Sequence, residues 1–107
     1  MNEILLVTTT FATEEEAEKL ATGVLEMRLA GCAQITGPGT SIYWWQGKLE
    51  KSKEYILTLK STPELYERLE RAIKANHPYD TPEIVATMTS HHCRQYKEWL
   101  DNELQGV

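Results

Sequence analysis

Residues 40–50 read Thr-Ser-Ile-Tyr-Trp-Trp-Gln-Gly-Lys-Leu-Glu, and the three consecutive aromatic residues in this stretch constrain how the chain folds. Side chains alternate between the faces of a strand, so Tyr43 and Trp45 share one face and Trp44 takes the other. A large aromatic side chain buries roughly 150–250 Å² when it is packed. At about 25 cal/mol per Å², leaving such a side chain exposed to water loses several kcal/mol of hydrophobic stabilisation. We expect a second copy of the chain to cover this surface by pairing along the strand; alternatively, the C-terminal helix folds over it.

Composition indicates one soluble globular domain over residues 1–107. Hydrophobic residues make up 41% of the chain and charged residues 25%. The net charge of −5 disfavours nucleic acid and acidic membrane surfaces as partners. The longest aliphatic run, Ile4 to Val7, is too short to cross a bilayer.

The N-terminus predicts a cytoplasmic protein. No basic region precedes the apolar run and no small-residue cleavage site follows it, so nothing resembles a secretory signal. In a reducing cytoplasm we expect Cys32 and Cys93 to be free thiols.

The first half of the chain predicts a strand, a helix and a long hairpin. The β-branched run 4–10 is typical of a central strand buried on both faces. Thr13 and Glu16 have the spacing of a capping box, which starts a helix that Gly31 is expected to end. Extended segments at 32–46 and 53–61 then form a hairpin, bent at residues 37–39 and turning around Gly47.

The second half predicts a helix, a strand and a final helix. Thr62 and Pro63 open a helix whose inner face carries Leu65, Leu69, Ala72, Ile73 and Asn76, and His77 before Pro78 ends it. Residues 83–89 form a fourth strand. A C-terminal amphipathic helix follows, marked by Tyr96, Trp99, Leu100 and Leu104. This order predicts an α+β protein with the ferredoxin-like split βαβ sandwich, a long bent hairpin and an extra helix.

Several motifs resemble the CutA family of divalent-cation tolerance proteins. They are the 40–50 stretch, Leu-Lys-Ser-Thr at 59–62, His-Pro-Tyr-Asp-Thr-Pro-Glu at 77–83, Leu-Ala-Gly-Cys-Ala-Gln-Ile at 29–35 and Tyr-Lys-Glu-Trp-Leu at 96–100. Together they span nearly the whole chain in order. The resemblance implies a homotrimer of ferredoxin-like subunits, without enzymatic activity, that is linked to tolerance of copper and other divalent metals.

The resemblance also leaves a second function open. The PII signalling proteins are similar trimers that bind small effectors between subunits, so a small-effector sensor is the alternative. In either case the expected cleft between subunits is lined by Trp45, Lys60, His77, Tyr79 and Glu83.

The expected metal ligands are Glu83 and His77, for copper or zinc. Family members for which copper binding has been suggested carry a cysteine late in the first strand and a histidine just before the His-Pro-Tyr motif, where this chain has Thr9 and Asn76. The soft ligands of residues 91–93, His-His-Cys, are adjacent and diverge, so we expect no physiological site there.

No catalytic signature accompanies either cysteine, and no phosphate-binding glycine loop is present in the sequence.

Overall fold

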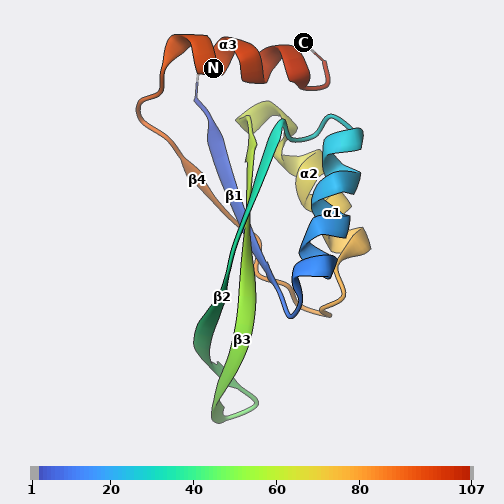
Figure 1. Cartoon of the computed structure of the whole chain (residues 1–107), viewed down its shortest axis with the longest axis vertical. Coiled ribbons are helices and arrows are strands. Elements are labelled where there is room, and N and C mark those ends of the chain that lie inside the picture. The colour runs from blue at the N-terminus through green and yellow to red at the C-terminus, as the bar shows by residue number, and fades with distance from the viewer. Residues whose placement is uncertain (1–2, 107) are drawn as a thin grey trace.

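The computed structural model describes residues 3–106 and shows a mixed α+β protein with a four-stranded antiparallel sheet and three α-helices (Figure 1). The elements are β1 (Leu5–Phe11), α1 (Glu14–Glu26), β2 (Cys32–Trp45), β3 (Lys48–Ser61), a short 3-10 turn (Pro63–Leu65), α2 (Tyr66–Asn76), β4 (Val85–Met88) and α3 (Arg94–Glu103). The strand order β2-β3-β1-β4 places β1 between β3 and β4, as the split βαβ arrangement requires. Within the described residues, no helix is long and apolar enough to span a membrane.

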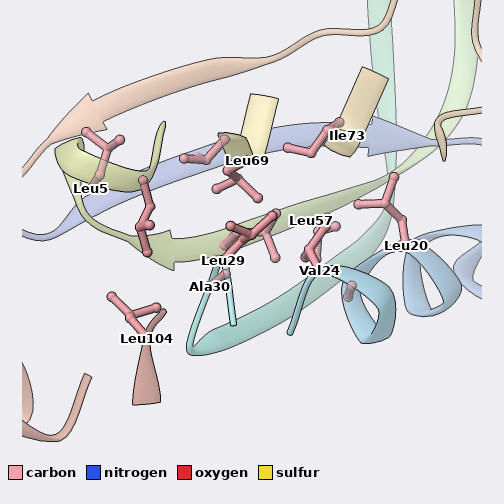
Figure 2. Packing of buried hydrophobic residues seen from close by; sticks show 14 of the residues in the cluster. Leu5, Leu20, Val24, Leu29, Ala30, Leu57, Leu69, Ile73 and Leu104 are labelled. Carbon is pink, nitrogen blue, oxygen red and sulfur yellow. The ribbon is translucent and has the colours of Figure 1, made fainter. Parts of the chain in front are cut away.

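The core lies between one face of the sheet and the helices α1 and α2 (Figures 1 and 2). Strand residues Val7, Leu57 and Leu59 are fully buried there, opposite Leu69 and Ile73 of α2. These positions follow from period-two spacing in the strands and helical spacing in α2.

The other face of β1 is less covered than the sequence suggests. Leu6 and Thr8 point away from the helices and are only half-buried, so the prediction of a strand buried on both faces is only partly right for a single chain. Neither α1 nor α2 packs on this second face of the sheet (Figure 1).

The first helix begins as predicted and ends differently. The Thr13 hydroxyl accepts a hydrogen bond from the Glu16 amide at 3.2 Å. At the other end, Arg28 rather than Gly31 takes the left-handed conformation, with φ of 62°. The amides of Arg28 and Leu29 donate to the carbonyls of Leu25 and Val24 at 2.9 and 3.1 Å, which forms a Schellman motif.

Gly31 serves packing instead. A Cβ there would lie 2.6 Å from Leu100 Cδ1 of α3, and Leu100 is fully buried. The glycine therefore allows α3 to approach the start of β2, which the sequence pattern alone did not indicate.

The hairpin of β2 and β3 is longer than predicted. The strands pair from Cys32 opposite Lys60 to Trp45 opposite Lys48, so β3 begins at Lys48 and not at residue 53. Gln46 and Gly47 have φ of 50° and 79°, as in the two-residue turns that suit twisted strands. The hairpin projects beyond the helices and stretches the molecule to 44 Å (Figure 1).

The pairing is irregular at the predicted bend. The register shifts between Thr36 and Gly39. Gly37 lies there with φ of 148°, and a Cβ would come within 3.0 Å of the Glu54 carbonyl oxygen. A glycine is thus required at this bulge on both conformational and steric grounds.

The projecting end of the hairpin carries the aromatic residues, and this chain leaves them open. Exposure reaches 72% for Trp44, 52% for Trp45 and 41% for Tyr43, and their neighbours Ile42 and Leu49 are more than half exposed. The helix α3 lies across the opposite end of the sheet (Figure 1). The alternative in which the C-terminal helix covers the tryptophans is therefore wrong.

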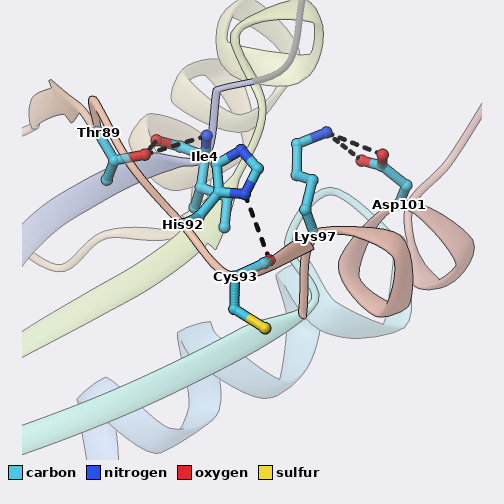
Figure 3. Close-up of polar contacts among 6 residues, drawn as sticks. All are labelled: Ile4, Thr89, His92, Cys93, Lys97 and Asp101. Carbon is cyan, nitrogen blue, oxygen red and sulfur yellow. Dashed lines mark hydrogen bonds and ion pairs between the residues drawn. The ribbon is translucent and has the colours of Figure 1, made fainter. Parts of the chain in front are cut away.

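The face of α3 that packs inward also differs from the prediction. Leu100 and Leu104 are buried as expected, whereas Trp99 is 43% exposed and Lys97 is buried in its place. The Lys97 ammonium donates to both carboxylate oxygens of Asp101 at 2.8 Å (Figure 3). The aliphatic stem of Lys97 can therefore pack inward while its charge is paired.

The last strand is shorter than residues 83–89, because only Val85–Met88 form the ladder. Thr89 still holds the chain to β1: its hydroxyl donates to the Ile4 carbonyl at 2.8 Å and accepts from the Ile4 amide at 3.2 Å (Figure 3). At the end of α2, Asn76 is exposed and its side-chain amide donates to the Ala72 carbonyl, so its predicted place on the inner face is wrong.

Candidate functional site

The His-Pro-Tyr motif lies directly after α2 and packs against the end of β1. His77 is extended, with φ of −82° and ψ of 139°, because the residue before proline avoids helical angles. Its imidazole stacks on the fully buried Phe11 ring at 4.3 Å between centroids and 15° between planes. This stacking joins the loop to the core.

Both imidazole nitrogens of His77 make hydrogen bonds. Nε2 lies 2.9 Å from the Thr10 carbonyl oxygen, which can only accept, so Nε2 carries the proton. Nδ1 accepts from the Tyr79 amide at 3.1 Å, so it must be unprotonated. The contacts therefore define a neutral imidazole in one tautomer.

The electrostatics of the loop agree with a neutral ring. Burial lowers the pKa of His77 below its ordinary value, while the Thr10 carbonyl and the carboxylates of Glu16 and Glu54 act in the opposite direction. The desolvation of the imidazolium outweighs these favourable interactions.

A pH dependence of stability follows. The pKa of His77 is lower in the folded than in the unfolded state, so the unfolded chain binds more protons between the two values. The free energy of unfolding should therefore contain a contribution that is fully present above pH ~6.5 and is lost as the pH falls through the folded pKa. Chemical denaturation of the wild type and of His77→Asn across this range measures it, because the variant lacks the titrating group. Equal pH slopes for the two proteins would contradict the assignment.

Tyr79 extends the cluster to the hairpin. Its ring lies 4.9 Å from the His77 ring, and its hydroxyl donates to Glu54 Oε2 of β3 at 3.1 Å. Burial, followed by the hydrogen bond to Glu54, raises the pKa of Tyr79 to about 12. The phenol therefore stays protonated at neutral pH and holds the Glu54 carboxylate in place.

The structure thus joins His77 and Tyr79 to three residues that sequence reasoning missed: Phe11, Glu16 and Glu54. They come from β1, α1 and β3, so no local spacing connects them with the motif. The sequence predicted Glu16 as part of the capping box that starts α1. Nothing in the sequence indicated that its carboxylate acts on the pKa values of His77 and Tyr79.

Two other predicted cleft residues, Lys60 and Trp45, lie elsewhere in the chain. Lys60 pairs with Leu6 of β1, whereas His77 contacts Thr10 of the same strand. Leu6 and Thr10 are four residues apart, which is about 13 Å along a strand. The Lys60 ammonium lies 5.3 Å from the centroid of the Tyr96 ring. Trp45 closes the hairpin turn at the far end of the molecule. Within one chain, these five residues do not form a single cleft.

The predicted metal ligands, Glu83 and His77, belong to no group of three ligands within the described residues. Glu83 is exposed in the loop before β4, and His77 could ligate an ion only by giving up one of its two hydrogen bonds. Over residues 3–106, no three His, Cys, Asp or Glu side chains are grouped so that they could hold a metal ion. This holds also for the exposed run 91–93, where the His92 imidazole instead contacts the Cys93 carbonyl (Figure 3).

Thr9 and Cys32, two positions considered in the sequence analysis, have clear surroundings. Thr9 is fully buried on the helix-covered face of β1, and its hydroxyl has no hydrogen-bond partner within the described part of the chain. Cys32 and Cys93 are both free thiols, as predicted.

Comparison with known proteins decides the family. The sequence profile of the CutA1 divalent ion tolerance proteins matches residues 5–103. This chain belongs to the CutA1 family. The divalent-cation tolerance protein CutA of Thermus thermophilus is 40% identical over 100 residues, covering 94% of this chain and 95% of that protein. The CutA protein of Citrobacter koseri is 37% identical over 103 residues, covering 96% and 90%.

Solved structures of CutA1 proteins share the fold. The crystal structure of CutA1 from Oryza sativa has a TM-score of 0.94 at 32% identity and covers 98% of this chain and 96% of its own. The resemblance inferred from the sequence motifs is confirmed. It favours a divalent-cation tolerance protein over a small-effector sensor.

Proposed function

We propose that this CutA1 chain acts in tolerance of divalent metal ions as a homotrimer and that it catalyses no reaction. The observation that carries the assembly is the open aromatic end of the hairpin, where Trp44 and Trp45 are more than half exposed on opposite faces. Exposed apolar surface of this kind, on strands at a sheet edge, is characteristic of an interface. A cyclic assembly would bury it in every subunit.

We further propose that the site for copper or zinc lies between subunits. Lys60 and Trp45 lie apart from the His77 and Tyr79 cluster within one chain, so only a neighbouring subunit can complete a cleft from all five residues. Glu83 supports the metal role because its carboxylate is exposed. His77 would line the cleft with its neutral ring and would coordinate only after losing a hydrogen bond.

Native mass spectrometry of freshly purified protein tests the assembly, with an expected mass of three times 12.3 kDa. Titration calorimetry with Cu²⁺ and with Zn²⁺ tests the metal. We expect Glu83→Ala to weaken binding at least about tenfold, while Glu67→Ala, which removes an exposed carboxylate on α2, leaves it unchanged. Identical isotherms for wild type and Glu83→Ala would remove Glu83 as a ligand.

A further inference from the structure

A groove of about 1000 Å³ runs along α1 to the end of α2, on the helix side of the molecule. Its apolar residues are Leu20, Val24 and Met27 of α1, together with Pro78 after α2. Met27 is 41% exposed, so apolar surface is open to a partner. The helices α1 and α2 that border this groove lie on the opposite side of the sheet from the open face of β1 (Figure 1).

The rim of the groove is acidic. It contains four glutamates and a single cation, Lys19, all from α1; the glutamates are Glu15, Glu16, Glu18 and Glu26. Glu15, Glu18 and Glu26 are exposed and make no ion pair within the part of the chain that the structure describes. The groove therefore combines an apolar floor with unneutralised negative charge.

A second observation is independent of the exposed charge. Glu16 lines the groove, and its Oε1 atom is buried and has no hydrogen-bond partner among residues 3–106. A buried carboxylate oxygen without a donor is unfavourable, and a donor from outside the chain would reach it once the Glu16 side chain turned outward.

Gly23 is a third observation. It lies inside α1, where glycine is the poorest helix former apart from proline. A Cβ at this position would meet no atom within 4 Å, so packing within the chain does not require glycine. Gly23 lines the groove, and the missing side chain keeps space for the close approach of another backbone.

We propose that this groove docks a cationic amphipathic peptide segment of another protein. Its apolar side chains would lie on Met27 and Pro78, with its backbone passing over Gly23. Its lysine or arginine side chains would pair with the glutamates of the rim. Charge complementarity selects this partner, since the rim repels acidic segments and the floor adds affinity only for a segment with an apolar face.

The test uses a fluorescein-labelled synthetic peptide of leucine and lysine arranged at helical spacing, with fluorescence anisotropy as the readout. A second peptide, in which serine replaces every leucine, measures attraction by charge alone. We expect the amphipathic peptide to bind at least about tenfold more tightly than the serine peptide. Equal affinities would overturn the proposal, because the apolar floor would then contribute nothing.

Variants of the protein locate the binding. Gly23→Trp fills the groove and should weaken binding of the amphipathic peptide about tenfold or more, whereas Gly23→Ala, which adds one methyl group, should weaken binding less and raise the thermal midpoint. Glu15→Gln combined with Glu18→Gln should weaken binding and reduce its salt dependence. The matched control, Glu67→Gln with Glu98→Gln, removes the same charge from exposed positions on α2 and α3.

Two results would contradict the proposal. One is unchanged peptide affinity in a Gly23→Trp protein whose thermal melt is cooperative. The other is an equal loss of affinity in the Glu15/Glu18 and Glu67/Glu98 variants, which would show that overall charge, not the groove, attracts the peptide.

Discussion

Replacing Trp45 by aspartate is expected to convert the proposed trimer into monomers. Trp45 is 52% exposed in the single chain and forms the closing pair of the hairpin with Lys48. If a neighbouring subunit covers it, the substitution places a charge in a desolvated apolar contact and removes a large buried area. The combined cost is several kcal/mol for each subunit contact. Light scattering after gel filtration should then report a mass near 12.3 kDa.

The conservative variant Trp45→Phe is the matched control, because it keeps an aromatic ring without introducing charge. We expect it to remain a trimer at micromolar concentration. A trimeric Trp45→Asp protein would place this residue outside the contact, and a monomeric wild type would remove the physical basis for the assembly.

Replacing Phe11 by alanine is expected to cause the largest loss of stability at the candidate site. Phe11 is fully buried and stacks on the His77 imidazole at 4.3 Å. Truncating a buried phenylalanine costs about 3–5 kcal/mol through lost burial and the remaining cavity. Denaturant unfolding at fixed protomer concentration measures this loss, since dissociation would otherwise shift the apparent stability.

The same substitution gives a local readout that a general core defect would not. Loss of the ring admits water to His77, so the pKa of its imidazole should rise toward the ordinary value of about 6.5. Histidine NMR signals followed against pH report this change. Phe11→Leu fills most of the volume and should cost only about 1–2 kcal/mol. An unchanged His77 titration in Phe11→Ala would contradict the role of the stacking.

Local rules predicted most of the elements and failed where long-range packing competed with them. Thr13 begins α1 as expected because N-capping depends on residues three positions apart. Arg28 ends that helix in place of Gly31, and its guanidinium donates to the Glu103 carbonyl and pairs with the Glu103 carboxylate on α3. The glycine is needed three residues later, where Leu100 leaves no room for a Cβ.

The C-terminal helix shows the same competition. Helical spacing placed Trp99 among the inward residues, yet Lys97 is buried instead. Lys97 and Leu100 lie three positions apart and share a face of the helix. The ion pair with Asp101 offsets the cost of burying the Lys97 side chain with its charged ammonium. Hydrophobicity alone could not predict that Lys97, paired with Asp101, is more buried than Trp99.

In the candidate site, too, the local motif could be predicted from the sequence, whereas the contacts that set its chemistry could not. The motif from His77 to Tyr79 was recognisable from its own residues, including the end of α2 before Pro78. Its tautomer and its lowered pKa depend on the Thr10 carbonyl and on burial against Phe11, which lie more than 60 positions away in the chain.

The sequence by itself determined the order of strands and helices and the family, and it predicted that the aromatic strand is covered by a second copy. Capping, periodicity and strand alternation act over a few residues, so they can be read from the chain directly. Only the tertiary structure decided that α3 lies at the opposite end from Trp44 and Trp45, that Lys60 lies apart from His77, and that α1 borders an acidic groove. Those outcomes depend on which segments pack together, and that choice is made by burial and shape over the whole molecule.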